Sequence, residues 1–234
     1  MIEAWLLAAS VWVIPVLLAI TLHEAAHGWV ALRLGDDTAQ RLGRVTLNPI
    51  KHVHPVGTIL LPGALIALGA PFIFGFAKPV PVNPARLRRP RRDMVLVALA
   101  GPGMNVLLAC LSALMLHIAP VFPTVMAEWW RITFTLGIVI NLVLAIFNML
   151  PVPPLDGGRV VHGLLPAGPA ARFARLERFG IIAVLVAFFL VPLVAAEFGS
   201  AFSPLAEIVL PPTAAGYELI VGIFGVEALV SWPM

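Results

Sequence analysis

The chain has 234 residues, of which 60% are hydrophobic and only 12% are charged. This composition excludes a disordered chain, a coiled coil and an ordinary soluble enzyme, because 12 acidic and 15 basic side chains cannot cover so apolar a core. The isoelectric point near 9.8 would suit a nucleic-acid-binding domain, but in membrane proteins an excess of Lys and Arg usually marks cytoplasmic loops. We therefore expect an integral membrane protein with no nucleic-acid partner.

Apolar segments long enough to cross a bilayer recur along the chain. The predicted spans are residues 4–32, 94–119, 132–150, 179–197 and 203–230. The start, Met1-Ile2-Glu3, lacks a basic region, so the first segment is expected to be retained as a span rather than cleaved. The sequence predicts an all-α polytopic membrane protein of about five to six transmembrane helices. It would form a single domain over residues 1–234, without a PDZ or other soluble domain.

The segment Ile59–Ala77 is apolar but interrupted by proline and glycine, and it could span or re-enter the membrane. If it re-enters, 14 of the 15 basic residues fall on one side and only Arg131 lies opposite; if it spans, the split is 10 against 5. The positive-inside rule favours a re-entrant hairpin or loop within a cytoplasmic region, residues 33–92. A kinked span remains the alternative. The 14 residues are Arg33, Arg41, Arg44, Lys51, Lys78, Arg86, Arg88, Arg89, Arg91, Arg92, Arg159, Arg172, Arg175 and Arg178.

The first span contains the HExxH motif His23-Glu24-Ala25-Ala26-His27. On a helix, residues i and i+4 lie one turn apart on the same face, so two imidazoles can bind one metal ion while Glu24 lies close enough to act on a metal-bound water. Ionisable side chains in an apolar span are costly unless they pair or bind something. A satisfied polar cluster or a proton relay is the alternative.

A catalytic zinc needs a third protein ligand and one open position. The candidate is Asp156, the only carboxylate between Glu128 and Glu177, which follows three prolines and precedes two glycines. Such a segment can turn a carboxylate back into a bundle. An ordinary loop aspartate in a glycine turn is the alternative. With an outside N-terminus, the first and third spans both run inward, so His23–His27 and Asp156 meet at similar depth on the cytoplasmic side.

These motifs together resemble the site-2 protease family of intramembrane zinc metalloproteases, in its compact, PDZ-free prokaryotic branch. The HExxH motif is matched by His23, Glu24 and His27, and the second signature by the run from Asn148 to Gly158. The resemblance extends over about Trp5–Gly180 and includes the run from Ala100 to Asn105.

The resemblance implies that His23, His27 and Asp156 bind one Zn²⁺ per chain. Glu24 would be the general base that takes a proton from the nucleophilic water and passes it to the leaving amine. Asn148 would hold the substrate backbone or stabilise the oxyanion, with a helix-capping or interhelical hydrogen bond as the alternative. Asn105 is interpreted as packing between spans.

One departure from the family pattern concerns His52-Val53-His54-Pro55, where relatives often have H-x-D-P. A structural or gating role is expected for His52 and His54. A second metal site, or capping of the zinc in a resting state, is the alternative.

The resemblance implies hydrolysis of a peptide bond in or near a transmembrane helix of a membrane-protein substrate, that is, regulated intramembrane proteolysis. The enzyme would be a multi-pass protein of the cytoplasmic membrane, with its active site toward the cytoplasm and the lipid bilayer as its surroundings. A homo-oligomer stays open. A non-proteolytic metal-binding membrane protein or carrier is the rival function, and an inactive family member acting as a binding module is a third.

Overall fold

The computed structural model describes residues 2–67, 75 and 77–230, which form helices and loops without a β-strand. The prediction of an all-α polytopic protein is confirmed. The α-helices of the described residues are α1 (Ile2–Arg33), α2 (Thr38–Arg41), α3 (Leu61–Ala67), α4 (Pro90–Leu116), α5 (Thr124–Asn148), α6 (Asp156–Leu164), α7 (Ala167–Ala174), α8 (Glu177–Leu185), α9 (Val191–Glu197) and α10 (Leu210–Phe224).

Five helical stretches within the described residues are long and apolar enough to cross a membrane. They are Ser10–Arg33, Pro90–Val121, Thr124–Asn148, Glu177–Glu197 and Leu205–Phe224. Each overlaps one of the five ranges expected from hydropathy, including the weak last one. The chain is therefore a multi-pass membrane protein.

Two of these helices differ from the predicted ranges for identifiable reasons. Helix α5 begins at Thr124 rather than near residue 132, because Glu128 and Arg131 form an ion pair of 2.5 Å one turn apart and continue the helix. The last helix ends at Phe224 rather than near residue 230, because Gly225 adopts a left-handed conformation with φ of 64°.

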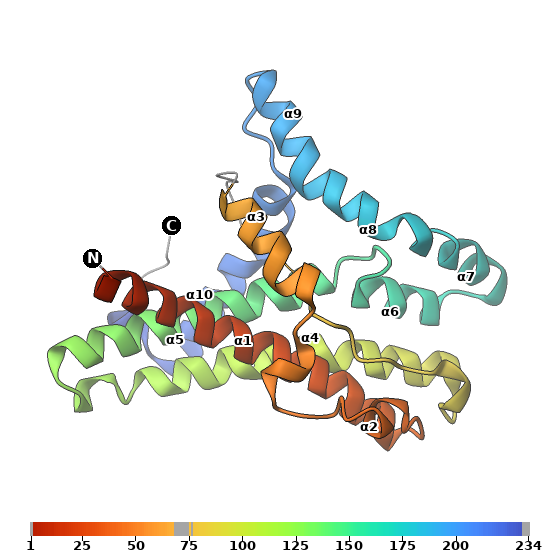
Figure 1. Cartoon of the computed structure of the whole chain (residues 1–234), viewed down its shortest axis with the longest axis horizontal. Coiled ribbons are helices and arrows are strands. Elements are labelled where there is room, and N and C mark those ends of the chain that lie inside the picture. Colours follow the sequence, from red (N-terminus) through yellow and green to blue (C-terminus); the bar gives the residue numbers. More distant parts are fainter. Residues whose placement is uncertain (1, 68–74, 76, 231–234) are drawn as a thin grey trace.

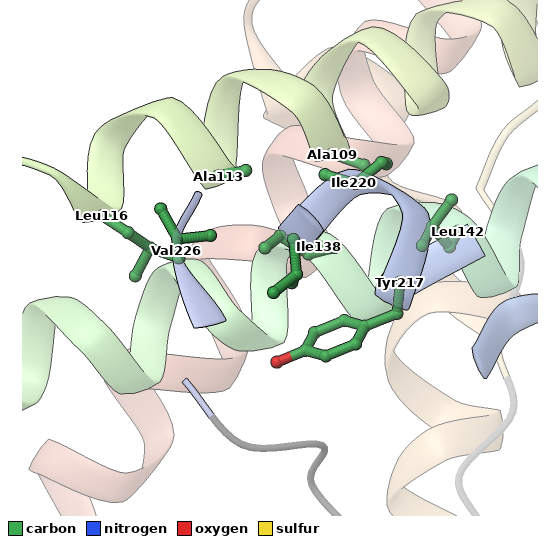
Figure 2. Packing of buried hydrophobic residues seen from close by; sticks show 9 residues of the cluster. Ala109, Ala113, Leu116, Ile138, Leu142, Tyr217, Ile220 and Val226 are labelled. Atoms are coloured by element: carbon green, nitrogen blue, oxygen red, sulfur yellow. The ribbon is translucent and has the colours of Figure 1, made fainter. Parts of the chain in front are cut away.

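Helices α1, α4 and α5 lie side by side and form the body of the molecule (Figure 1). Helix α10 packs against α4 and α5 through a buried apolar cluster (Figure 2). In this cluster Ala109 and Ala113 of α4 face Ile138, Tyr217 and Ile220. Small residues at such contacts let spanning helices approach closely, which compensates for the absence of a hydrophobic drive between helices in lipid.

The fourth candidate span is an arm, made of α8, the π-helical turn Val186–Leu190 and α9, that extends away from the body (Figure 1). It joins the rest through a small cluster in which Phe188 packs on Phe147, with ring centroids 5.1 Å apart, and Val184 packs near Val209. Most of its apolar side chains are exposed, as expected for a surface that faces lipid.

The segment for which a re-entrant structure is expected is only partly within the described residues. A π-helical turn, Pro55–Leu60, leads into α3, and the described part of this apolar helix is shorter than a span. Residues 68–74 and 76 lie outside the described residues. The re-entrant path therefore stays a prediction.

An irregular segment that we call the strap, residues 78–88, lies along the C-terminal half of α1. Its Lys78 N–H donates to the carbonyl of His52 at 2.8 Å, and its Asn83 N–H donates to the buried carboxylate of Asp36 at 2.6 Å. Close approach also requires Gly28 of α1, where a Cβ atom would come within 3.1 Å of Val80. The strap is thus fixed on the part of α1 that carries the HExxH motif.

Candidate metal centre

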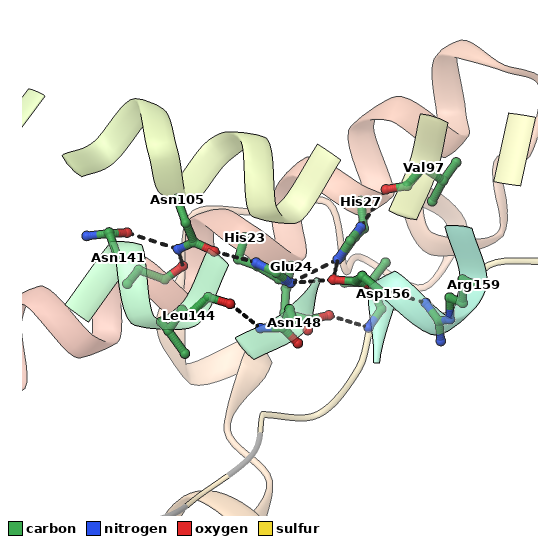
Figure 3. Close-up of polar contacts among 12 residues, drawn as sticks. His23, Glu24, His27, Val97, Asn105, Asn141, Leu144, Asn148, Asp156 and Arg159 are labelled. Atoms are coloured by element: carbon green, nitrogen blue, oxygen red, sulfur yellow. Dashed lines mark hydrogen bonds and ion pairs between the residues drawn. The ribbon is translucent and has the colours of Figure 1, made fainter. Parts of the chain in front are cut away.

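His23 and His27 lie one turn apart on α1 and point the same way, as their spacing predicts (Figure 3). Their Nε2 atoms are 3.0 Å apart, and both side chains are buried between helices. The two rings meet edge to face, with centroids 4.6 Å apart. This arrangement brings two ring nitrogens to a single point in the interior of the bundle.

Asp156, the first residue of α6, completes the group. Its Oδ2 atom lies 3.2 Å from the Nε2 atom of each histidine. Among the residues that the structure describes, His23, His27 and Asp156 are the set of three or more potential ligands close enough to hold one metal ion. The histidines and the aspartate are 129 or more residues apart in the chain, so the fold creates this group.

The loop between α5 and α6 turns Asp156 inward because glycine follows it. A Cβ atom on Gly157 would collide with the carbonyl oxygens of Met149 and Leu150, and one on Gly158 would lie 2.6 Å from the Pro153 nitrogen. The backbone thus folds tightly onto itself directly after α5 ends. Only residues without a side chain permit that path, which explains the Asp-Gly-Gly sequence.

The other ring nitrogen of each histidine is bound from outside the group (Figure 3). His27 Nδ1 lies 2.7 Å from the carbonyl oxygen of Val97 and must therefore carry the proton and donate it. His23 Nδ1 donates to Asn105 Oδ1 at 2.6 Å. Both Nε2 atoms are consequently left with a lone pair that faces Asp156.

Asn105 is held so that its oxygen must face His23. Its amide nitrogen donates to the carbonyl of Ala19 at 3.3 Å and to Asn141 Oδ1 at 2.9 Å, and Asn141 donates in turn to the carbonyl of Gly137. Asn105 is completely buried. This series of hydrogen bonds joins α1, α4 and α5 and fixes the tautomer of His23.

Three electron-pair donors therefore converge with no proton between them, which is unfavourable unless a cation lies there. Asp156 Oδ2 is buried and accepts no hydrogen bond. Zinc binds nitrogen and oxygen at about 2.0–2.2 Å, so ligand atoms of a tetrahedral site lie roughly 3.3 Å apart, close to the observed 3.0 and 3.2 Å. The residues fit a metal ion of this kind.

Gly101 of α4 lets the two histidine rings lie directly against this helix. A Cβ atom at this position would collide with His27 Nε2 and would lie 2.5 Å from His23 Nε2. The missing side chain therefore permits the close approach of both imidazoles to α4.

A neighbouring cation favours the charged form of the Asp156 carboxylate. Arg159, one turn along α6, lies 3.9 Å from the other carboxylate oxygen. The carboxylate is thus kept in the form that binds metal.

Glu24 is not among the three clustered ligands. Its Oε2 atom accepts a hydrogen bond of 2.7 Å from the backbone N–H of Val80 in the strap, and its side chain is half-buried. The glutamate is thereby held by a second element rather than by its own helix.

The remaining candidates lie outside the cluster. Asn148, at the end of α5, donates to the carbonyl of Leu144 in its own helix at 2.9 Å. His54 accepts from the Gly57 N–H at 3.0 Å and caps the π-helical turn, which is a function that an aspartate performs equally well. His52 is buried and donates to the carbonyl of Thr46 at 3.0 Å. Neither histidine belongs to the group around Asp156.

The sequence alone did not reveal the roles of Gly101 and Val97, or the fact that the side-chain oxygen of Asn105 faces His23. The run from Ala100 to Asn105 carried a signal, because an asparagine follows a Gly-Pro pair inside an apolar span. Its interpretation as packing between spans was incomplete: Asn105 joins three helices and also holds a member of the cluster.

The family model of "Peptidase family M50" matches residues 11–122 and 115–194 of the chain. The chain belongs to peptidase family M50. The resemblance to site-2 proteases is thus confirmed, and the chain is a metallopeptidase.

Named relatives agree with this assignment. The chain is 42% identical over 180 residues to the "Putative zinc metalloprotease YwhC" of Bacillus subtilis, covering 75% of this chain and 78% of the relative. It is 32% identical over 172 residues to the "Putative zinc metalloprotease Rip2" of Mycolicibacterium smegmatis, covering 73% of this chain and 63% of the relative. The identity to the "Putative zinc metalloprotease Rip2" of Mycobacterium tuberculosis is 33% over 172 residues, covering 74% of this chain and 64% of the relative. No solved structure matches the chain significantly.

Replacing Gly101 by alanine should weaken metal binding strongly, because the new methyl group would displace the imidazoles of His23 and His27. We expect bound zinc to fall about tenfold or more, measured by elemental analysis of the purified protein. Gly103→Ala is the matched control, since a Cβ atom there meets nothing within 4 Å. Equal metal content in the two variants would contradict this role of Gly101.

Replacing Asn105 by leucine should weaken zinc binding about 10- to 100-fold, because His23 loses the acceptor that fixes its tautomer. Asn105→Asp keeps an acceptor and should retain more affinity than the leucine variant. The measurement is a competition titration against a zinc chelator, with thermal unfolding as a check of the fold. Unchanged affinity in Asn105→Leu would show that the asparagine only packs.

Proposed function

We propose that the chain is a zinc-dependent intramembrane endopeptidase that cleaves a peptide bond in or near a transmembrane helix of a membrane-protein substrate. One zinc ion per chain would be held by His23, His27 and Asp156. The observation that carries the proposal is the buried, unpaired Asp156 oxygen facing two imidazole lone pairs inside a bundle of spanning helices. The names of the relatives, which include the words zinc metalloprotease, support the choice of metal.

The chemistry divides between the metal and Glu24. When bound, the zinc ion supplies a Lewis acid and lowers the pKa of a coordinated water. Glu24 is part of the same helical turn as both histidines but coordinates nothing, so its carboxylate is free to take a proton from the attacking water and give it to the leaving amine. Asn148, whose amide nitrogen is bound to its own helix, would offer its remaining donor or its oxygen to the substrate backbone.

The strap positions this base. The Val80 N–H donates to one carboxylate oxygen, which leaves the other oxygen of Glu24 for proton transfer. Pro79 and Pro81 flank Val80 and have no N–H, so Val80 is the one donor in this stretch that can reach the glutamate. The hydrogen bond fixes the rotamer of Glu24 without protonating it.

The orientation follows from the distribution of charge. Fourteen of the 15 basic residues share one side if the segment Ile59–Ala77 re-enters the membrane, and the positive-inside rule favours this path. We infer a cytoplasmic membrane location with basic loops on the cytoplasmic side. His27 and Asp156, near the ends of α1 and α5 that lead into those loops, then lie toward the cytoplasm.

The substrate must be unwound locally, because the carbonyl groups of a helix are occupied by its own hydrogen bonds. The backbone around His52, whose carbonyl accepts the N–H of Lys78, would pair in the same way with an extended substrate strand.

Glu24→Gln should separate this function from that of a metal carrier. The variant keeps all three ligands, so zinc content should be unchanged, while cleavage of a model transmembrane substrate should fall about 10²- to 10⁴-fold. Glu177→Gln, the same change at an exposed site, should cleave normally. Cleavage by Glu24→Gln at the wild-type rate would overturn the proteolytic function and favour the carrier.

Val80→Pro removes the N–H that holds Glu24 and should slow cleavage about 10- to 100-fold with zinc content unchanged. Val80→Ala keeps the N–H and is the matched control. In a Glu24→Gln background the proline should cause no further loss, because both changes act on the same group. Additive losses would show that Val80 contributes only to the structure.

A further inference from the structure

A shallow groove of about 500 Å³ lies where the start of α4 meets the end of α6. Arg91, Arg92, Val95 and Leu96 form one wall and residues 163–166 form the other. The volume falls in the range typical of small-molecule sites. None of these residues belongs to the metal centre.

The residues of α4 that line the groove change from charged to apolar along the helix. Arg91 and Val95 are four residues apart and so share a face, as do Arg92 and Leu96. The spanning stretch begins at Pro90, so the arginines lie in its first turn, and the two apolar residues lie about 6 Å deeper. The groove therefore runs from the membrane interface into the apolar layer.

The floor of the groove is a tight contact between the two helices. A Cβ atom on Gly163 would lie 2.9 Å from the carbonyl oxygen of Arg91 and would collide with Val95. Arg91 also donates to the carbonyl of Leu165. Arg92, in contrast, makes no hydrogen bond or ion pair with the part of the chain that the structure describes, so its charge is available.

The charge around the groove is strongly positive. Five arginines occur in residues 86–92, and of these Arg86 is neutralised by Asp37 at 2.5 Å. The carboxylate of Asp93 is buried and accepts the Arg89 N–H at 2.7 Å, so it caps the helix. No acidic side chain lines the groove.

We propose that this groove binds one anionic glycerophospholipid, with its phosphate at Arg91 and Arg92 and an acyl chain along Val95, Leu96 and Leu164. A free phosphate would use the arginines but leave the apolar wall without a partner. A zwitterionic lipid would fill the apolar wall but bring no net charge to the arginines. Basic pockets between helices at the cytoplasmic surface of a membrane suit this class of ligand, and this choice rests on the orientation proposed above. A bound lipid would bridge α4 and α6, the helix whose first residue is Asp156.

The test is native mass spectrometry of the purified full chain in mixed micelles of phosphatidylglycerol and phosphatidylcholine. The wild type should retain one phosphatidylglycerol in preference to phosphatidylcholine. Arg92→Gln should weaken this retention about fivefold, the loss expected for one basic residue near a lipid headgroup, while Arg92→Lys should stay within about twofold. Because Arg92 has no partner to lose, the unfolding temperature without added lipid should not change.

Arg172→Gln is the matched control, since Arg172 is exposed on α7 and lines no part of the groove. Equal losses in Arg172→Gln and Arg92→Gln would overturn the site, because retention would then follow overall charge. Equal retention of the two lipids would also overturn it. Displacement of the lipid by glycerol phosphate at equal concentration would show a site for free phosphate instead.

Discussion

The structure depends on one electrostatic constraint: two imidazole lone pairs and a carboxylate oxygen converge within 3.2 Å inside an apolar bundle. Such a group repels itself and would be expelled toward water unless a cation occupies its centre. The fold must therefore hold the three donors in place against this repulsion. The helices that surround the cluster are arranged to do this.

Helix α4 holds the two imidazoles, and the loop after α5 holds the carboxylate. The carbonyl of Val97 and the amide of Asn105, both on α4, fix the two rings of α1. The tight loop after α5 fixes Asp156. Because three helices contribute, a change in the packing of any one alters the geometry of the centre. The buried bond between Asn105 and Asn141 is therefore as important to this geometry as the three clustered side chains themselves.

The sequence predicts the parts of this site that follow from local periodicity. His23, Glu24 and His27 can be read from helical spacing, and the family signature points to Asp156. The roles of the Val97 carbonyl and of the close contact at Gly101 could not be predicted, because they depend on where α4 crosses α1. Every residue has a carbonyl, and an apolar span contains several glycines. For the fold, the number of candidate spans was predictable from hydropathy, but helix ends depended on single features such as the Glu128–Arg131 pair and the left-handed Gly225.

Helix α6 connects the metal centre to the surface of the bundle. Its nine residues place Asp156 at one end and the contact with Arg91 at the other, a length of about 13 Å. A helix this short has little stability of its own and takes its position from what it touches. Glycines fix it at both ends, Gly157 against the loop after α5 and Gly163 against α4. A ligand that tightened the outer contact would therefore act on the same short helix that carries Asp156.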